Sequence, residues 1–253
     1  MESHISDRFT IKAIEYDKYR PSYPLEFINF IKHDILSTRN KIVADIGSGT
    51  GLFTKQILPY CKILYGIEPN DEMRRYAEES LSNINKFISL KGTAEKTNLL
   101  SNSIDCITVS QAFHWFDKEK CKAEFQRVMK NSDLVLLLWN NRIHNNMGNQ
   151  FLAEFDKIIS EFGYNYENKP TKINIEEIET FFDKGPNLYK CNNPYYLNFD
   201  QLLGTLMSSS YIYSLDNQRK MDLILLLQKL FLKYKKNNKV LFMYESILFY
   251  GHI

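Results

Sequence analysis

The first half of the chain alternates short apolar runs with polar stretches of helical spacing. The runs are brief, and several are rich in β-branched residues: Ile42–Asp45, Ile63–Glu68, Phe87–Lys91, Ile104–Ser110 and Leu134–Trp139. The stretches between them, such as Asp71–Leu81 and Lys118–Met129, suit amphipathic helices. Strands that recur about every 20 to 30 residues with helices between them predict βαβ units and a parallel sheet. Right-handed crossovers then place helices on both faces of that sheet.

The segments on either side of this block differ in character. Pro24–Leu36, which precedes it, has the apolar spacing of an amphipathic helix. Residues 143–235, which follow it, are expected to be mostly helical, with turns at Gly185-Pro186 and at Asn192–Pro194. Val240–Tyr250 is rich in β-branched and aromatic residues and is predicted to be a final strand.

No internal repeat or low-complexity linker divides the chain, so we expect a single α/β domain over residues 1–253. Its expected parts are an N-terminal helical cap (1–40), a core (41–140), a mostly helical cover (141–235) and a C-terminal strand (236–253).

The overall composition is that of a globular protein, with 44% hydrophobic and 25% charged residues. The net charge is +2, from 32 basic and 30 acidic residues. This balance argues against affinity built mainly on phosphate neutralisation, so no nucleic-acid partner is expected. No apolar run approaches the roughly 20 residues of a membrane span, so no membrane partner is expected. Met1–Thr10 has no apolar core of a secretory signal.

The four cysteines form no C-x-x-C pair, and the histidines show no metal-ligand spacing. We therefore predict no metal site and expect reduced, buried thiols, as is usual for a cytoplasmic protein. The sequence does not indicate an oligomeric state.

One glycine-rich turn stands out, because only ten glycines occur in the chain and three of them fall within Asp45-Ile46-Gly47-Ser48-Gly49-Thr50-Gly51. The turn joins the first predicted strand to a helix that opens at Leu52. Glycine allows tight turning and close approach of a ligand to the backbone. A loop leading into a helix also offers amide N–H groups and a partial positive charge. The segment therefore predicts a ligand-binding loop.

Two ligand classes use such a loop. Dinucleotides bind with the spacing G-x-G-x-x-G, whereas here the spacing is G-x-G-x-G. Asp45 ends the strand just before the turn, where its carboxylate would repel a pyrophosphate but would favour a ligand carrying an ammonium and a sulfonium. S-adenosylmethionine therefore fits this loop better than a dinucleotide does.

Three further strand ends carry polar loops that meet this one. Glu68 ends the second strand, 21 positions after Gly47, where a carboxylate would accept hydrogen bonds from ribose hydroxyls; nicotinamide sites use the same arrangement. Gly92–Glu95 follows the third strand and Ser110–Asp117 ends the fourth. Ligands of open α/β sheets bind at the carboxyl ends of the strands, where all four loops lie.

The segments Asp45–Gly51, Gly66–Pro69, Gly92–Glu95 and Gln111–Asp117 together resemble the class I S-adenosylmethionine-dependent methyltransferases. They are most similar to the small-molecule "type 11" branch, which includes trans-aconitate methyltransferase-like enzymes, and Tyr16–Pro24 is similar to that branch's N-terminal segment. The resemblance covers about residues 8–140. It implies a Rossmann-like, mostly parallel seven-stranded sheet with helices on both faces and a helical cover inserted after the fifth strand.

The resemblance also implies a role for each matching residue in binding S-adenosylmethionine. Gly47, Gly49 and Gly51, with Ser48 in the same loop, would pack on the methionine and ribose. Asp45 would lie near the amino group and Glu68 would bind the ribose. The other implied contacts are Met73, Ala94 and Glu95 at the adenine, Ser110 and Gln111 at the methionine moiety, and Tyr19 and Arg20 closing over the cofactor, with Arg20 a candidate for its carboxylate.

The acceptor is expected to be a small molecule methylated in line at a carboxylate, hydroxyl or amine. A carboxylate needs no general base, whereas a phenol or amine benefits from one. His114, after the fourth strand, is the candidate catalytic base; the alternative interpretation is that His114, Trp115 and Phe116 pack as a wall of the pocket. Arg142, past the fifth strand, is either a ligand of a substrate carboxylate or a solvated loop charge.

Several other functions stay open. They are methylation of RNA or protein, a nicotinamide-dependent oxidoreductase on the same fold, and a cofactor-binding protein without turnover. Asn193-Pro194-Tyr195-Tyr196 resembles the N-P-P-Y signature of enzymes that methylate amino groups of DNA bases or glutamine. That signature belongs at the end of the fourth strand and needs a second proline, so we attribute the match to chance.

Overall fold

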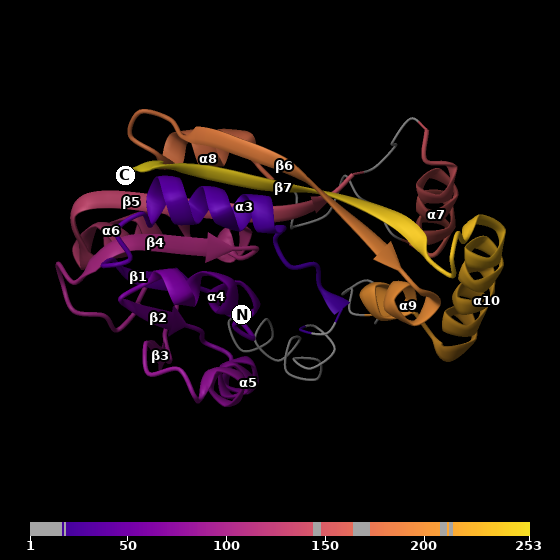
Figure 1. Cartoon of the computed structure of the whole chain (residues 1–253), viewed down its shortest axis with the longest axis horizontal. Helices are drawn as coiled ribbons and strands as arrows, with labels where there is room; N and C mark the ends of the chain where they lie inside the picture. The colour runs from indigo at the N-terminus through magenta and orange to yellow at the C-terminus, as the bar shows by residue number, and fades with distance from the viewer. Residues whose placement is uncertain (1–16, 18, 144–147, 164–172, 208–211, 213–214) are drawn as a thin grey trace.

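The computed structural model describes residues 17, 19–143, 148–163, 173–207, 212 and 215–253. Of the expected N-terminal cap (1–40), residues 1–16 and 18 lie outside the described residues. Within them, one sheet has the strand order β3-β2-β1-β4-β5-β7-β6 (Figure 1). Its strands are β1 (Ile42–Ile46), β2 (Ile63–Ile67), β3 (Phe87–Leu90), β4 (Ile104–Ser110), β5 (Met129–Arg142), β6 (Asn187–Leu197) and β7 (Val240–His252).

The sheet is mostly parallel, as predicted. β1 to β5 run parallel to one another, whereas β7 is antiparallel to both β5 and β6. All five apolar runs and the C-terminal run are strands. In register, Asp45 of β1 lies between Gly66 of β2 and Thr108 of β4. The carboxyl ends of these strands therefore bring the four polar loops to one edge.

Helices cover both faces of the sheet, as the crossover rule predicts. The described helices are α3 (Leu25–Phe30) with the π-helix η1 (Ile31–Ile35), α4 (Leu52–Ile57), α5 (Asp71–Leu81), α6 (Lys118–Val128), α7 (Gln150–Glu161), α8 (Ile175–Phe181), α9 (Phe199–Met207), α10 (Asn217–Tyr234), and the 3-10 turns η2 (Leu58–Tyr60) and η3 (Phe113–Trp115). β5 shows the two-sided burial directly. Val135 and Leu137 pack with α6 and α8, while Leu136 and Leu138 pack with α3 and α4.

A third apolar cluster lies beyond the core of the sheet. It joins α7, α9 and α10 to the extended ends of β6 and β7, where Leu197, Val240 and Phe242 are buried. Figure 1 shows these two strands reaching past the rest of the sheet to this group of helices. We call α7, α9, α10 and these strand ends the cover.

The prediction of a turn at Asn192–Pro194 is wrong, because these residues lie inside β6. Alternate residues of β6 point to opposite faces, and β6 is the last strand in the sheet order. An edge strand tolerates proline because one side of its backbone has no partner strand. Pro194 therefore fits in β6 at register with Met243 of β7, and the turn-forming residue types gave a misleading local signal.

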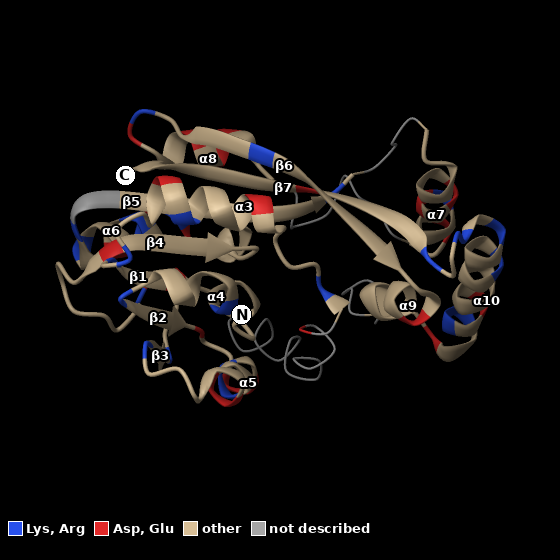
Figure 2. Ribbon diagram, in the orientation of Figure 1, with Lys and Arg blue, Asp and Glu red and all other residues tan. Residues whose placement is uncertain are grey.

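Charged residues of both signs are interspersed over the helices (Figure 2). No helix in the described ranges is long and apolar enough to cross a membrane. The same part of the chain holds no group of three or more His, Cys, Asp or Glu side chains placed to bind a metal ion.

Candidate active site

The glycine-rich turn after β1 folds as a left-handed loop against its neighbours. Gly47 has φ +70°, and a Cβ there would lie 2.6 Å from the Cβ of Ala112, so both the backbone angle and the space require glycine. The carbonyl of Ile67 accepts hydrogen bonds from the amides of Gly47 (2.8 Å) and Ser48 (3.1 Å). Gly51 N in turn donates to Ser48 O at 2.9 Å. The loop is thus held by β2 and by itself.

Glu68 ties this loop to the start of α5. Its Oε2 accepts from Gly49 N and its Oε1 from Asn70 N, both at 2.9 Å. Asn70 caps α5, because its Oδ1 accepts from the amides of Glu72 and Met73. Burial raises the pKa of the Glu68 carboxyl, although the amides of Asn70 and Gly49 and the charge of Arg74 act to lower it. Glu68 therefore helps to fix the conformation of the glycine loop as well as the start of α5.

Asp45 is fully buried beneath the loop. Its Oδ2 accepts from Thr54 Oγ1 at 2.6 Å, and its Oδ1 accepts from Thr108 Oγ1 at 2.9 Å. Burial raises the pKa of Asp45 to about 6, against the two threonine hydrogen bonds and with a small contribution from Glu68. The carboxyl connects β1, α4 and β4 and does not line the cavity described next.

One cavity opens at the carboxyl edge of the sheet, among the glycine loop and the strand ends beside it. The predicted residues that line it are Arg20, Gly47, Ser48, Gly49, Ser110 and Gln111. The lining residues that the sequence analysis missed are Pro21, Tyr23, Thr50, Leu52, Phe53, Asn140 and Tyr244. Thr50, Leu52 and Phe53 adjoin the glycine motif, and Asn140 comes directly after the predicted fifth strand, so spacing alone could have suggested them.

Tyr244, in contrast, does not adjoin any motif or strand end that the sequence linked to the site. It lies on β7, and the antiparallel register places it opposite Arg142 at the end of β5. A residue about 100 positions further along the chain therefore reaches the same cavity.

The predicted adenine contacts lie around the loop and outside the cavity lining. Met73 is buried on α5, and its sulfur is 3.8 Å from the position of a Cβ on Gly49. Ala94 is buried, and Glu95 Oε1 accepts from Asp117 N at 3.0 Å, which joins the loops after β3 and β4. Gly51 packs against Ala77 of α5. The four loops thus meet, but these residues do not face the open space.

Tyr19 contacts the cover. A Cβ on Gly204 of α9 would lie 2.5 Å from the Tyr19 ring, and Thr205 Oγ1 donates to Tyr19 O at 3.2 Å. Tyr19 is therefore next to the cavity-lining Arg20 in sequence but is itself packed on α9.

His114 lies in η3, half-buried, with its ring centroid 4.8 Å from that of Trp115. It is not among the residues that line the cavity, and its catalytic role stays a prediction.

Arg142 pairs with Asp156 of α7 and lies over the Phe155 and Phe242 rings. It is therefore a partly buried ion pair that attaches β5 to the cover and not a solvated loop charge, while a role toward a substrate carboxylate stays a prediction. Asn193–Tyr196 lies within β6 and not at the end of β4, which agrees with a chance match to the N-P-P-Y signature.

Comparisons with known proteins agree with this geometry. A family model described as "Methyltransferase domain" matches residues 44–137. A methyltransferase-like protein of Schizosaccharomyces pombe is 26% identical over 84% of this chain and 81% of its own length. A probable S-adenosylmethionine-dependent methyltransferase of Saccharomyces cerevisiae is 30% identical over 54% of this chain and 47% of its own length. The chain thus spans about half the length of this second relative.

Solved structures share the fold. A putative methyltransferase from Anaeromyxobacter dehalogenans superposes with a TM-score of 0.69 at 17% identity, over 92% of this chain and 98% of that one. A putative methyltransferase from Anabaena variabilis gives a TM-score of 0.62 at 17% identity, over 92% and 98%. Together, the strand order, the match to a methyltransferase domain over residues 44–137 and these relatives show that the chain is similar to S-adenosylmethionine-dependent methyltransferases and shares a methyltransferase fold.

Proposed function

We propose that this protein transfers the methyl group of S-adenosylmethionine to a small-molecule acceptor held in the cavity at the carboxyl edge of the sheet. The observation that carries the proposal is the set of residues that line one cavity. Its lining combines the glycine loop with Ser110 and Gln111 at the end of β4, Asn140 of β5 and Tyr244 of β7. A cavity to whose lining Arg20, Pro21 and Tyr23 also contribute suits a small acceptor better than a polymer strand. The mixed surface charge (Figure 2) also favours it over RNA.

The hydrogen bonds of the glycine loop favour the methyl donor over a dinucleotide. The amides of Gly47, Ser48, Gly49 and Gly51 all donate to acceptors inside the protein. A diphosphate site needs such amides to point at the ligand. A Haemonchus contortus phosphoethanolamine N-methyltransferase solved with S-adenosylhomocysteine has a related fold, with a TM-score of 0.54 at 14% identity, over 95% of this chain and 57% of that one.

The site residues are proposed to act as follows. Glu68 keeps lone pairs beyond the two that its amide partners use, and these accept the ribose hydroxyls. Asp45 acts from beneath the loop through its charge and not by contact. Arg20 pairs with the methionine carboxylate. The adenosine side is supported by Met73, Ala94, Glu95 and Gly51. The methionine is bordered by Ser48, Ser110 and Gln111. Tyr19 anchors the segment that carries Arg20.

The bound donor supplies a methyl group on a sulfonium with a neutral leaving group. The protein therefore has to align the acceptor and exclude water. The described cavity lining contains no carboxylate, imidazole or thiol. This favours acceptors that need no proton removed, such as carboxylates, over phenols and protonated amines.

Calorimetric titration with S-adenosylhomocysteine and with NAD tests the donor class. We expect binding of the first only. Glu68→Gln should weaken S-adenosylhomocysteine binding about tenfold, because hydrogen bonds to a charged group contribute roughly 1.5–3 kcal/mol. Glu79→Gln, an exposed position on α5, is the matched control and should bind like the wild type. Binding of NAD alone would refute the donor assignment.

A methyl-transfer assay tests the acceptor class. Panels of small carboxylates, hydroxyl compounds and amines are compared with RNA and with protein substrates, using labelled S-adenosylmethionine. We expect transfer to a small molecule, with carboxylates preferred. Transfer confined to RNA or protein would overturn the proposed acceptor.

A further inference from the structure

Residues 19–23 form a strap that joins the cover to the core across the cavity. At its start, Tyr19 packs on Gly204 and accepts from Thr205, both on α9. At its end, the backbone of Tyr23 makes two hydrogen bonds with the Gln56 amide on α4, at 3.0 and 2.8 Å. Arg20, Pro21 and Tyr23 all line the cavity. The strap therefore forms part of the cavity wall.

The hydroxyl of Tyr23 connects the strap to the end of β4. It shares a 3.0 Å hydrogen bond with Ser110 Oγ at the end of β4. Its ring stacks on Phe27, with centroids 4.9 Å apart, and meets the edge of Phe53 at 5.3 Å.

The middle of the strap is held by side-chain amides of β5 and β6. Asn140 Nδ2 donates to Pro21 O at 2.8 Å and to Ser22 O at 3.3 Å. Asn193 Nδ2 donates to Ser22 O at 2.9 Å. Ser22 N donates to the Tyr195 hydroxyl at 2.8 Å. These bonds fix the backbone on which Arg20 and Tyr23 are carried.

Asn140 is the centre of this network. Its Oδ1 accepts from Ser246 Oγ of β7 at 2.5 Å and from Asn193 Nδ2 of β6 at 3.1 Å. Its backbone carbonyl accepts from Gln111 Nε2 at 3.2 Å. Carbonyl oxygens only accept, so the amide orientation is forced: Nδ2 must face the strap and Oδ1 must face β6 and β7. One amide thus links three strands, the strap and a cavity-lining side chain.

We propose that Asn140 is a positioning residue for methyl transfer, which holds the strap so that Arg20 and Tyr23 face the glycine loop. Ser246 and Asn193 fix the orientation of its amide. The inference rests on the proposed function for the reaction itself, but the position of the strap is a property of the ligand-free protein. An error of about 1 Å in positioning can lower turnover on the order of a hundredfold.

The sharpest variant is Asn140→Asp, which keeps the shape but puts an oxygen against the carbonyls of Pro21 and Ser22. Asn102→Asp makes the same change in an exposed turn before β4 and is the matched control. Hydrogen exchange of ligand-free protein should show faster exchange at Ser22 and Tyr23 in Asn140→Asp. Exchange in β1 and β4 should be unchanged. kcat should fall about a hundredfold at saturating donor, and the control should match the wild type in both measurements.

Ser246→Ala provides the second variant, since it removes one donor to Oδ1 and leaves the bonds to the strap in place. We expect intermediate exchange at Ser22 and Tyr23, with a loss of turnover of about tenfold or less. If Asn140→Asp does not fold, this variant carries the test. Unchanged strap exchange in both variants, or faster strap exchange with normal turnover, would overturn the positioning role. A wild type that binds no S-adenosylhomocysteine would refute the proposed function instead, and the exchange result would still report on the strap.

Discussion

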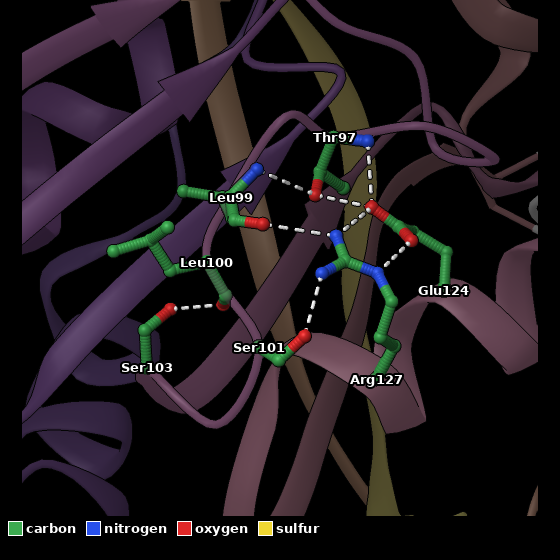
Figure 3. A network of polar contacts seen from close by, with 7 residues as sticks. All are labelled: Thr97, Leu99, Leu100, Ser101, Ser103, Glu124 and Arg127. Atoms are coloured by element: carbon green, nitrogen blue, oxygen red, sulfur yellow. Dashed lines mark hydrogen bonds and ion pairs between the residues drawn. The ribbon is translucent and has the colours of Figure 1, made fainter.

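Carboxyl groups at the two edges of the sheet have opposite pKa shifts. At the amino edge, Glu124 on α6 accepts from Thr97 N, Thr97 Oγ1 and two nitrogens of Arg127 (Figure 3). Arg127 also donates to Leu99 O and Ser101 Oγ, which ties the loop before β4 to α6. Partial burial acts to raise the pKa of Glu124, but these bonds together lower it to about 2.

At the carboxyl edge, Asp45 and Glu68 are buried more deeply and have raised pKa values. Asp45 is hydrogen-bonded to neutral hydroxyls, and Glu68 to backbone amides. The difference teaches that a carboxylate is stabilised where the protein supplies its own cation. At the cavity edge, uncharged donors bond to Asp45 and Glu68, and under the proposed function the methyl donor brings the further positive charge.

The largest effect should follow from disturbing the loop that organises the cavity edge. Gly47→Ala combines a left-handed φ with a contact at 2.6 Å. We expect a loss of about 3 kcal/mol in the free energy of unfolding, since left-handed strain costs about 1–2 kcal/mol and overpacking about 1–3 kcal/mol. S-adenosylhomocysteine binding should be lost as well. Urea denaturation and calorimetry measure the two.

Gly185→Ala is the control for this prediction, because Gly185 has the same φ of +70° with no atom within 4 Å of an added Cβ. It should lose only about 1 kcal/mol and keep ligand binding. Equal losses in the two variants would show that close packing at Gly47 does not matter.

A smaller effect is expected at the amino edge. Glu124→Gln should lower the free energy of unfolding by about 1–2 kcal/mol at neutral pH, because it removes hydrogen bonds between charged groups, and it should leave ligand binding unchanged. The folded-state pKa is depressed from 4.5 to about 2. The contribution is therefore complete above pH 4.5 and lost as the pH falls toward 2.

Urea denaturation of wild type and Glu124→Gln across this pH range checks the prediction. The difference between them should shrink as the solution is acidified. A difference that stays constant down to pH 2 would contradict the assignment of the stabilising charge to Glu124.

The smallest effect concerns Asp45, whose pKa is raised from 3.8 to about 6. In ligand-free protein its ionisation opposes folding, so its contribution to stability falls as the pH rises from 3.8 to 6 and is constant above. The ionised form favours the ligand's ammonium. S-adenosylhomocysteine affinity should therefore rise on the order of fivefold as the pH passes from one unit below 6 to one unit above.

Calorimetry on wild type and Asp45→Asn measures this dependence, which the variant should lack. Asp200→Asn, an exposed position on α9, should keep it. A flat profile in the wild type would mean that the charge of Asp45 does not reach the ligand.

Local pattern determined the strands β1 to β5, the glycine turn and the acidic residues at two strand ends. Parallel strands share a carboxyl edge, so the sequence order alone predicted which loops meet. Only the tertiary structure decided that Asp45 is turned to Thr54 and Thr108, that β6 runs through Asn192–Pro194, and that Tyr244 of β7 completes the cavity. These outcomes depend on antiparallel pairing across long stretches of chain and on single polar side chains finding partners. Neither leaves a periodic signal along the sequence.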